Sequence, residues 1–238
     1  MATDLFDILH EDDDLLALNK PAGLVCHPTK GDESSSLAGR LRLYLGDGPV
    51  HLINRLDRET SGVVIVAKTD AAARELRRLW ETRAVEKTYW AIVHGHVEPT
   101  EGAIDAPLGS DEASAVAVKD CVRPDGHPSE THFRVIREFT RETAPFTHLE
   151  LNPRTGRKHQ LRIHCAHLGH PIVGDKIYGG DESLYLKLVH GELTETDHQT
   201  LLLKNQALHA AQLQFNWRET DWQFEAPASQ EFVQFLNG

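Results

Sequence analysis

The sequence predicts an α+β protein with a largely antiparallel, mixed β-sheet core and flanking helices, folded as one domain over residues 1–238. Predicted strands follow one another in runs instead of alternating strictly with helices, which favours this class over a doubly wound parallel sheet. Hydrophobic residues make up 40% of the chain and charged residues 26%, close to an average globular composition. A chain of 238 residues is also long enough to bury a sizeable core.

The first half of the chain is predicted to hold three strands and two helices. Short strands at Leu5–Leu9 and Leu15–Asn19 flank an acidic turn. Apolar residues at helical spacing, preceded by three serines that can cap a helix, predict a helix within Ser34–Leu45. The β-branched run Gly62–Lys68 is typical of a buried strand. Asp70 is expected to cap the amphipathic helix that follows it.

The second half is predicted to add four strands and two helices. Alternating or β-branched apolar residues indicate the strands, and apolar residues three or four positions apart indicate the helices. The strands are expected at Glu86–His94, Thr131–Glu138, Phe146–Leu151 and Ala207–Trp217, and the helices at Lys158–Leu168 and Ser229–Leu236.

The net charge of −11, from 25 basic and 36 acidic side chains, argues by itself against a nonspecific nucleic-acid binder. The charge is patterned, however. Acidic residues are concentrated in residues 1–50 and 101–150, while no acid lies between Leu151 and His170. The acid-free stretch between Leu151 and His170 carries four basic residues, so an acidic protein can still present a basic face.

Three widely spaced cysteines, Cys26, Cys121 and Cys165, form no CxxC pair. A disulfide scaffold and a cysteine-based zinc site are therefore not expected, and a reducing cytosol is favoured. The acidic N-terminus lacks the apolar core of a secretory signal, and no apolar stretch approaches the roughly 20 residues of a membrane helix. The expected location is cytoplasmic.

Three stretches have the composition of functional sites. The first, Asn54–Gly62, places Asp57 between arginines on a loop that leads into a buried strand, although a lone loop Asp is more often a turn residue. The second, Glu86–Gly95, alternates as a strand does, and its Tyr89 by itself indicates only core packing. The third, Asn152–Asp175, opens a predicted helix with basic residues, where backbone N–H groups can receive a phosphate.

Together, these stretches resemble the RluA-type pseudouridine synthases, which isomerise uridine to pseudouridine in RNA. The resemblance rests on Arg-Leu-Asp through Thr-Ser-Gly at Arg55–Gly62, on the Lys-x-Tyr-x-Ala pattern from Lys87, and on Thr-Gly-Arg-x-His-Gln-Leu-Arg from Thr155. It extends to His-Pro-Ile-x-Gly-Asp at His170–Asp175. Asn54 replaces the usual His, and its amide can keep a side-chain hydrogen bond. Because the pattern begins near residue 5, no N-terminal S4-type domain is expected.

The resemblance implies a pseudouridine synthase-like fold and assigns three catalytic residues. Asp57 would be the carboxylate that acts at C1′, at C6 or on the 2′ proton, and the sequence leaves these three routes open. Arg162 would be its charge partner. Tyr89 would stack on the target uracil and serve in proton transfer at C5. The reaction exchanges no atoms or electrons with another molecule, so no cofactor or metal is expected.

The implied partner is structured RNA, ribosomal or transfer, acted on by a monomer without an obligate protein partner. The target base must be extruded, and Arg55 is a candidate to fill the vacated stack. Lys158, where the family often has Thr or Ser, adds a positive charge. The residues expected to contact RNA are Arg55, Arg154, Arg157, Lys158, His159 and Gln160.

Three other functions remain open from the residues alone. Four nearby histidines (His159, His164, His167 and His170) suggest a metal, but no HExxH pattern accompanies them. A glycoside hydrolase needs two cooperating carboxylates, and the matched patterns supply only Asp57 as a candidate. A noncatalytic RNA-binding module would keep the basic helix but would not need Asp57 or Tyr89.

Overall fold

The computed structural model describes residues 6–28, 33–46 and 48–238, so the predicted start of the first strand at Leu5 lies outside the described residues. The chain forms two compact units. The first unit combines residues 1–88 with 209–229, and the second combines residues 89–208 with 230–238. The expectation of one catalytic domain over 1–238 stays a prediction. Within the described part of the chain, no helix is both long and apolar enough to cross a membrane.

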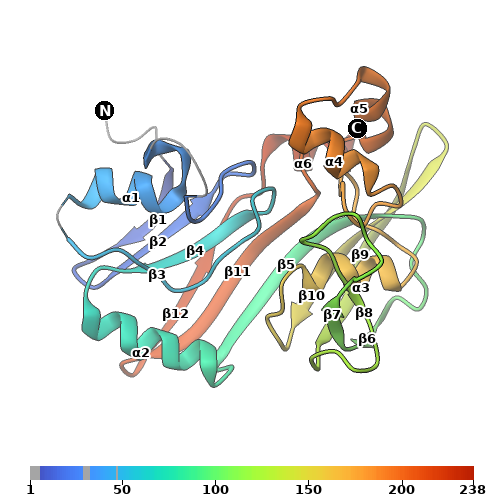
Figure 1. The fold of residues 1–238 in the computed structure, drawn as a ribbon. Coiled ribbons are helices and arrows are strands. Elements are labelled where there is room, and N and C mark those ends of the chain that lie inside the picture. Colours follow the sequence, from blue (N-terminus) through green and yellow to red (C-terminus); the bar gives the residue numbers. More distant parts are fainter. Residues whose placement is uncertain (1–5, 29–32, 47) are drawn as a thin grey trace. The chain divides into compact units, whose positions relative to one another are not determined.

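The first unit contains a five-stranded sheet path that Figure 1 shows from blue to red. Its neighbours in order are β1 (Asp7–Glu11), β2 (Leu15–Lys20), β4 (Ser61–Ala67), β11 (Leu208–Trp217) and β12 (Thr220–Glu225), with β3 (His51–Leu52) also paired to β4. Every pair is antiparallel except β4 with β11. As predicted, β4 is buried along its whole length.

Helix α2 (Asp70–Glu81) supplies the apolar layer of this unit. Its Ala72, Ala73 and Leu76 are buried in one cluster with residues of the sheet, among them Ile65 and Phe215. The cap differs from the prediction: Thr69 is the extended N-cap residue, and its side chain accepts from the backbone N–H of Ala72 at 3.2 Å. The predicted Asp70 cap is therefore wrong by one position, because Asp70 is already helical.

The N-terminal helical segment follows the prediction closely. A short 3₁₀ turn (Glu33–Ser35) leads into α1 (Leu37–Leu45). Ser36 is the N-cap, and its hydroxyl accepts from the N–H of Gly39 at 3.1 Å. This bond satisfies one of the donors that the first helical turn leaves without an internal partner.

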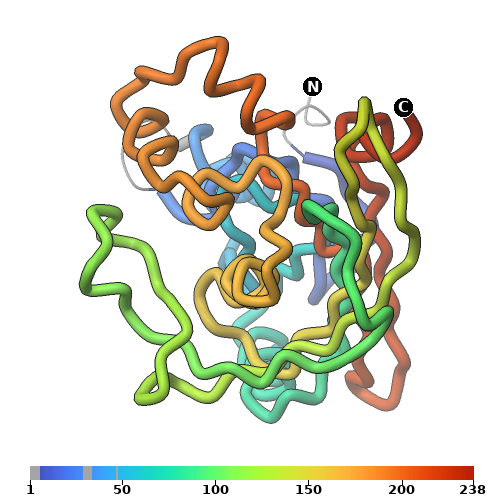
Figure 2. The backbone as a smooth tube through the Cα atoms, turned by 90° about the vertical axis from the view of Figure 1, so that its right-hand side faces the viewer, coloured from blue at the N-terminus to red at the C-terminus, as the bar shows by residue number. Residues whose placement is uncertain are grey.

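The second unit is built on an antiparallel sheet with the order β5 (Val85–His94), β10 (Ala144–Pro153), β9 (Glu130–Arg141) and β6 (Glu101–Asp105). Strands β7 (Leu108–Ser110) and β8 (Asp120–Val122) pair as a separate two-stranded sheet, the green hairpin of Figure 2. The helices of this unit are α3 (Gln160–His167), α4 (Ser183–His190), α5 (Glu195–Leu201) and α6 (Gln230–Asn237).

Several elements of the second unit depart from the sequence prediction. Helix α3 begins at Gln160 and not at Lys158, because His159 has a left-handed φ of 56° that no α-helix continues through. The predicted strand pair is real but longer, and the short elements β6, β7, β8, α4 and α5 were not predicted.

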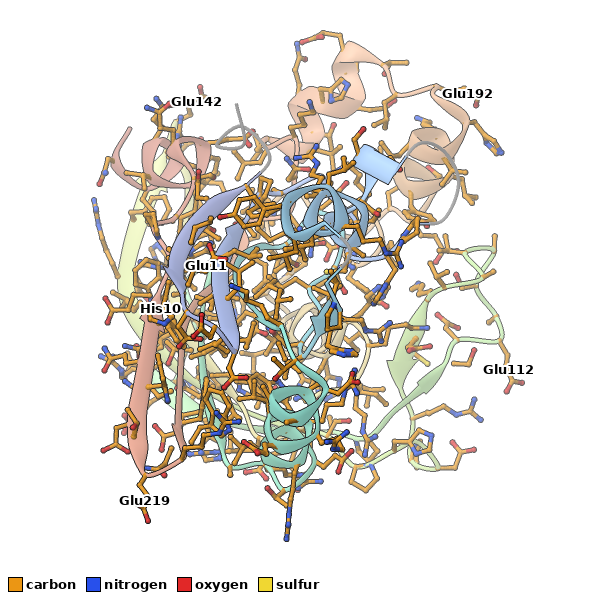
Figure 3. The ribbon with its side chains drawn as sticks, turned by 90° about the vertical axis from the view of Figure 1, so that its left-hand side faces the viewer. His10, Glu11, Glu112, Glu142, Glu192 and Glu219 are labelled. Atoms are coloured by element: carbon orange, nitrogen blue, oxygen red, sulfur yellow. The ribbon has the colours of Figure 1, made fainter. Side chains whose placement is uncertain are left out.

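Acidic side chains occupy several exposed turns. Figure 3 shows Glu112 at the end of the β7–β8 hairpin, Glu142 between β9 and β10, Glu192 between α4 and α5, and Glu219 between β11 and β12. The last turn has positive φ at both central residues, the geometry that suits the twist of a two-residue hairpin. Part of the acidic excess thus lies at the ends of turns.

A close backbone approach fixes the parallel pairing of β4 and β11. Gly62 lies opposite Ala210, and a Cβ at Gly62 would lie 2.2 Å from the Ala210 carbonyl oxygen. One residue earlier, the Ser61 hydroxyl lies 2.9 Å from Nδ1 of the buried His209, whose Nε2 lies 2.9 Å from the Ala226 carbonyl oxygen. Because a carbonyl only accepts, Nε2 carries the proton and Nδ1 accepts from Ser61.

Gly62→Ala is expected to destabilise the protein strongly. Overpacking costs about 1–3 kcal/mol, and the φ of +116° at Gly62 adds backbone strain for any other residue. Urea unfolding would measure the loss. Gly156→Ala is the matched control, because its Cβ would meet nothing within 4 Å. Equal stability of the two variants would contradict the close approach.

Candidate active site

The Asp57 loop lies between β3 and β4 and is tied to the buried strand by Asn54. The Asn54 amide nitrogen donates to the Val63 carbonyl at 3.1 Å, and its oxygen accepts from the Ile65 N–H at 2.8 Å. Asn54 thus keeps the side-chain hydrogen bonding expected of it. Asp57 itself is half-buried, and its carbonyl accepts from the Thr60 N–H at 3.2 Å in a tight turn.

Two basic side chains accompany Asp57 on this loop. Arg55 and Arg58 are both exposed, while Leu56 between them is buried and anchors the loop. The Cys26 thiol lies against the backbone of Leu56, 3.3 Å from its carbonyl oxygen. The half-buried carboxylate of Asp57 therefore lies on a loop that is anchored by the buried Leu56 and that exposes two arginines.

Lys20 is the residue of this region that sequence reasoning did not single out. It is fully buried, and its ammonium donates to the carbonyls of Pro21 (2.8 Å), Leu24 (2.8 Å) and Arg58 (3.2 Å). An ammonium has three N–H donors, so these three bonds satisfy it completely. Lys20 thereby joins the turn after β2 to the Asp57 loop. Its only signal in the sequence was the run Asn19-Lys20-Pro21, which also resembles the family.

Burial lowers the pKa of Lys20 to about 8, although the neighbouring Cys26 and Asp57 oppose the shift. Burying the Lys20 ammonium without the three carbonyl acceptors would cost much free energy, since burial removes its hydration.

In the second unit, Arg162 forms a buried, two-pronged ion pair with Asp175. Its Nε and Nη2 donate to the two carboxylate oxygens at 2.7 and 2.8 Å. Asp175 Oδ1 also accepts from the backbone N–H groups of Ile177 (2.9 Å) and Tyr178 (3.0 Å). Burial alone raises the pKa of Asp175, but Arg162 and these N–H groups outweigh it, so the net shift is downward.

This pair adds Asp175 to the residues of the candidate site. The side chain of Arg162 is almost fully buried. Its guanidinium lies 5.0 Å from the ring centre of Tyr178. Asp175 was missed as a partner, although it ends the quoted His170–Asp175 pattern, because the sequence does not show which charges meet in the interior.

The loop before α3 presents three exposed cations, Arg154, Arg157 and Lys158. Lys158 pairs with Asp120 of β8, with Nζ 3.0 Å from Oδ1. His159 is half-buried, and its Nδ1 lies 2.9 Å from the Tyr178 hydroxyl.

Gln160 has a different position from its neighbours in the loop. Its side chain is buried, and its oxygen accepts from the Thr155 hydroxyl (2.7 Å) and the Arg157 N–H (3.0 Å). Its nitrogen donates to the Glu130 carbonyl (2.9 Å) and the Thr131 hydroxyl (3.0 Å). All four hydrogen bonds of the amide are therefore made within the protein, which supports a role in shaping the loop.

Tyr89 lies on β5, where it pairs with Leu151 of β10, and its side chain is half-buried. Of the three residues predicted to be catalytic, Asp57 belongs to the first unit, and Tyr89 and Arg162 belong to the second. Within the second unit, Arg162 contacts Asp175 and Tyr178, and the Tyr178 hydroxyl lies next to His159 of the basic loop.

The histidines near α3 take part in hydrogen bonds with the protein. His164 Nδ1 lies 2.8 Å from the Thr131 hydroxyl and its Nε2 lies 3.1 Å from the Ala106 carbonyl oxygen. His170 Nδ1 lies 2.8 Å from the carbonyl oxygen of His94. Among the residues that the structure describes, no three His, Cys, Asp or Glu side chains gather as metal ligands.

The charge of Lys20 gives a pH dependence of stability with a definite sign. Between about pH 8 and 10.5 the unfolded chain keeps a proton at Lys20 that the folded chain has released. The free energy of unfolding therefore rises with pH in this window, by up to about 3 kcal/mol relative to Lys20→Met.

Urea unfolding of both proteins across this range would measure the difference. Lys204→Met, at an exposed lysine, is the matched variant and is expected to follow the wild type. Parallel curves for the wild type and Lys20→Met would contradict the environment assigned to Lys20.

Known proteins are similar to this chain over most of its length. A family model described as RNA pseudouridylate synthase matches residues 14–167. The dual-specificity RNA pseudouridine synthase RluA of Vibrio parahaemolyticus is 38% identical over 218 residues, which cover 91% of this chain and 80% of that protein. The ribosomal large subunit pseudouridine synthase D of Salmonella typhimurium is 33% identical, over 97% of this chain and 69% of that protein.

Solved structures give the same result for the fold. Human RNA pseudouridylate synthase domain containing 1 superposes with a TM-score of 0.76 at 26% identity, covering 96% of this chain and 85% of that one. Human RNA pseudouridylate synthase domain containing 4 gives 0.75 at 29% identity, covering 97% and 91%. The α+β class with a pseudouridine synthase-like fold is thereby confirmed. The chain belongs to the RNA pseudouridylate synthase family, as an RluA-type isomerase that converts uridine to pseudouridine in RNA.

Proposed function

We propose that the chain modifies specific uridines in structured ribosomal or transfer RNA, with Asp57 as the catalytic carboxylate and with extrusion of the target base. The observation that carries the proposal is the fixed Asp57 loop, in which Asn54 and Lys20 hold a half-buried carboxylate beside exposed arginines. Among the relatives, one is named for dual specificity and one for the large ribosomal subunit. Both RNA classes therefore remain in the proposal. A cytoplasmic location and a monomeric state stay predictions.

The proposed reaction breaks the N1–C1′ bond, turns the detached uracil and joins C5 to C1′. The C5 proton leaves and N1 ends protonated, so atoms balance without a co-reactant. A carboxylate near C1′ serves each of the three routes left open: attack at C1′, attack at C6, or removal of the 2′ proton. We assign this role to Asp57, since it is the acid of the matched Arg55–Gly62 pattern.

The remaining roles are proposed from the family resemblance and from the chemistry of the side chains. Arg162 supplies a positive charge that favours an ionised carboxylate, and Asp175 acts as its positioning residue by fixing the guanidinium plane. Tyr89 offers a ring for stacking on uracil and a hydroxyl for proton transfer at C5. The exposed cations Arg55, Arg154, Arg157 and Lys158 are proposed to contact RNA phosphates, and Arg55 is also proposed to fill the space of the extruded base.

Asp57→Asn is expected to reduce turnover by at least about 10³-fold while RNA binding largely survives. Tritium release from RNA that contains 5-tritiated uridine measures turnover, and filter binding measures affinity. Glu59→Gln removes the same charge two positions away and is the matched control. Release by Asp57→Asn within tenfold of the wild type would rule out the assignment. A noncatalytic RNA-binding module would bind RNA but release no tritium even as wild type.

Lys158→Ala is expected to flatten the salt dependence of RNA binding. The log–log slope should change by less than the value for one full phosphate contact, which is about 0.7–0.9, because Asp120 already neutralises part of the Lys158 charge. Asp120→Asn, which leaves Lys158 unpaired, is expected to strengthen binding and steepen the slope. Measuring the RNA affinity of both variants and the wild type between low and moderate salt would give the three slopes. An unchanged slope in both variants would remove Lys158 from the RNA-contacting set.

A further inference from the structure

The outer face of α2 carries a row of arginines that the proposed active site does not use. Arg77 and Arg78 follow Arg74 by three and four positions, so all three share one face of the helix, opposite the buried Ala72 and Leu76. All three are exposed, as is Arg83, two positions after the helix ends. We call these four residues the α2 arginine row; α2 is the teal helix of Figure 1.

Two acids of α2 have hydrogen-bond partners other than these arginines. Asp70 Oδ1 lies 2.7 Å from Nε2 of His51. Glu75 Oε2 accepts from the Trp217 indole N–H and from Arg218 Nε, both at 2.8 Å. Of the acids on α2, only Glu81 remains near the row without such a partner among the described residues.

The arginines themselves have few partners. In the described part of the chain, Arg74, Arg78 and Arg83 take part in no ion pair with an acid. Arg77 differs from these three, because its Nη2 lies 3.4 Å from Nδ1 of His51, whose Nε2 is bound to Asp70.

This concentration of charge costs the fold stability. Like charges at i and i+4, as in Arg74 and Arg78, destabilise a helix by their mutual repulsion. After burial, repulsion from Arg83 is the second cause that lowers the pKa of Lys87. In a chain with a net charge of −11, an uncompensated row of this kind points to an anion outside the chain.

We propose that the α2 arginine row is a second RNA-binding surface, which holds phosphates of the substrate RNA away from the target nucleotide. The inference rests on the proposed function, since it takes RNA to be the partner. Arg74 and Arg78 are about 6 Å apart along the helix axis, a separation suited to neighbouring phosphates of one strand. Guanidinium groups also suit phosphate geometry, because they can donate two parallel hydrogen bonds.

The test compares Arg74→Gln/Arg78→Gln with the wild-type full chain, using unmodified total transfer RNA as the probe. Two lost phosphate contacts should reduce the log–log salt slope of binding by about 1.4–1.8 and weaken binding at low salt by tenfold or more. Arg42→Gln/Arg134→Gln is the matched control, because it removes two exposed arginines and leaves α2 intact. The control should keep a slope within about 0.5 of the wild type. Arg74→Lys/Arg78→Lys should restore most of the slope.

Equal slopes for the α2 double variant and the control would overturn the proposal, because any effect on binding would then come from the loss of two positive charges and not from contacts made by α2. Loss of binding to vesicles of anionic phospholipid, with RNA binding unchanged, would overturn it in favour of a membrane partner. Tritium release by the wild type separates this test from the proposed function. If the wild type releases none from any RNA, the activity assignment fails, while the binding comparison still decides the role of α2.

Discussion

The buried ion pair between Arg162 and Asp175 is the interaction on which the second unit depends most. Two charges taken out of water are stable only when geometry and further hydrogen bonds replace their hydration. Here, both carboxylate oxygens meet the guanidinium, and two backbone N–H groups complete the set. The requirement for this geometry fixes α3 relative to the 175–178 turn, and through Tyr178 it also orders His159 in the basic loop.

The first unit solves a similar problem with a lone cation. Within the described residues, Lys20 has no acid in hydrogen-bond contact, and three carbonyl oxygens take the place of water around its ammonium. One of these carbonyls belongs to Arg58, next to Asp57. In both units, then, a buried cation holds a loop that the family resemblance assigns to function. Neither loop depends on its own turn sequence alone for its shape.

Surface charge follows a different pattern from buried charge. Acids occupy peripheral turns or are paired with nearby cations, as Glu75 is with Arg218. Among the described residues, most of the exposed arginines near Asp57, before α3 and on α2 have no acid partner, whereas Lys158 pairs with Asp120. A net charge of −11 therefore does not exclude an RNA partner, because electrostatic recognition depends on the local field at the contact surface.

Hydrophobic period and motif order are local properties, so they were enough to predict the fold class, most element positions and the family patterns around Asp57, Tyr89 and Arg162. The hydrogen bonding of Asn54 was also predicted. Three features became visible only in the folded chain: the start of α3 at Gln160, the burial of Lys20 and the pairing of Arg162 with Asp175. These depend on which distant groups meet in a space without water, as Lys20 meets the carbonyl of Arg58 from 38 positions away.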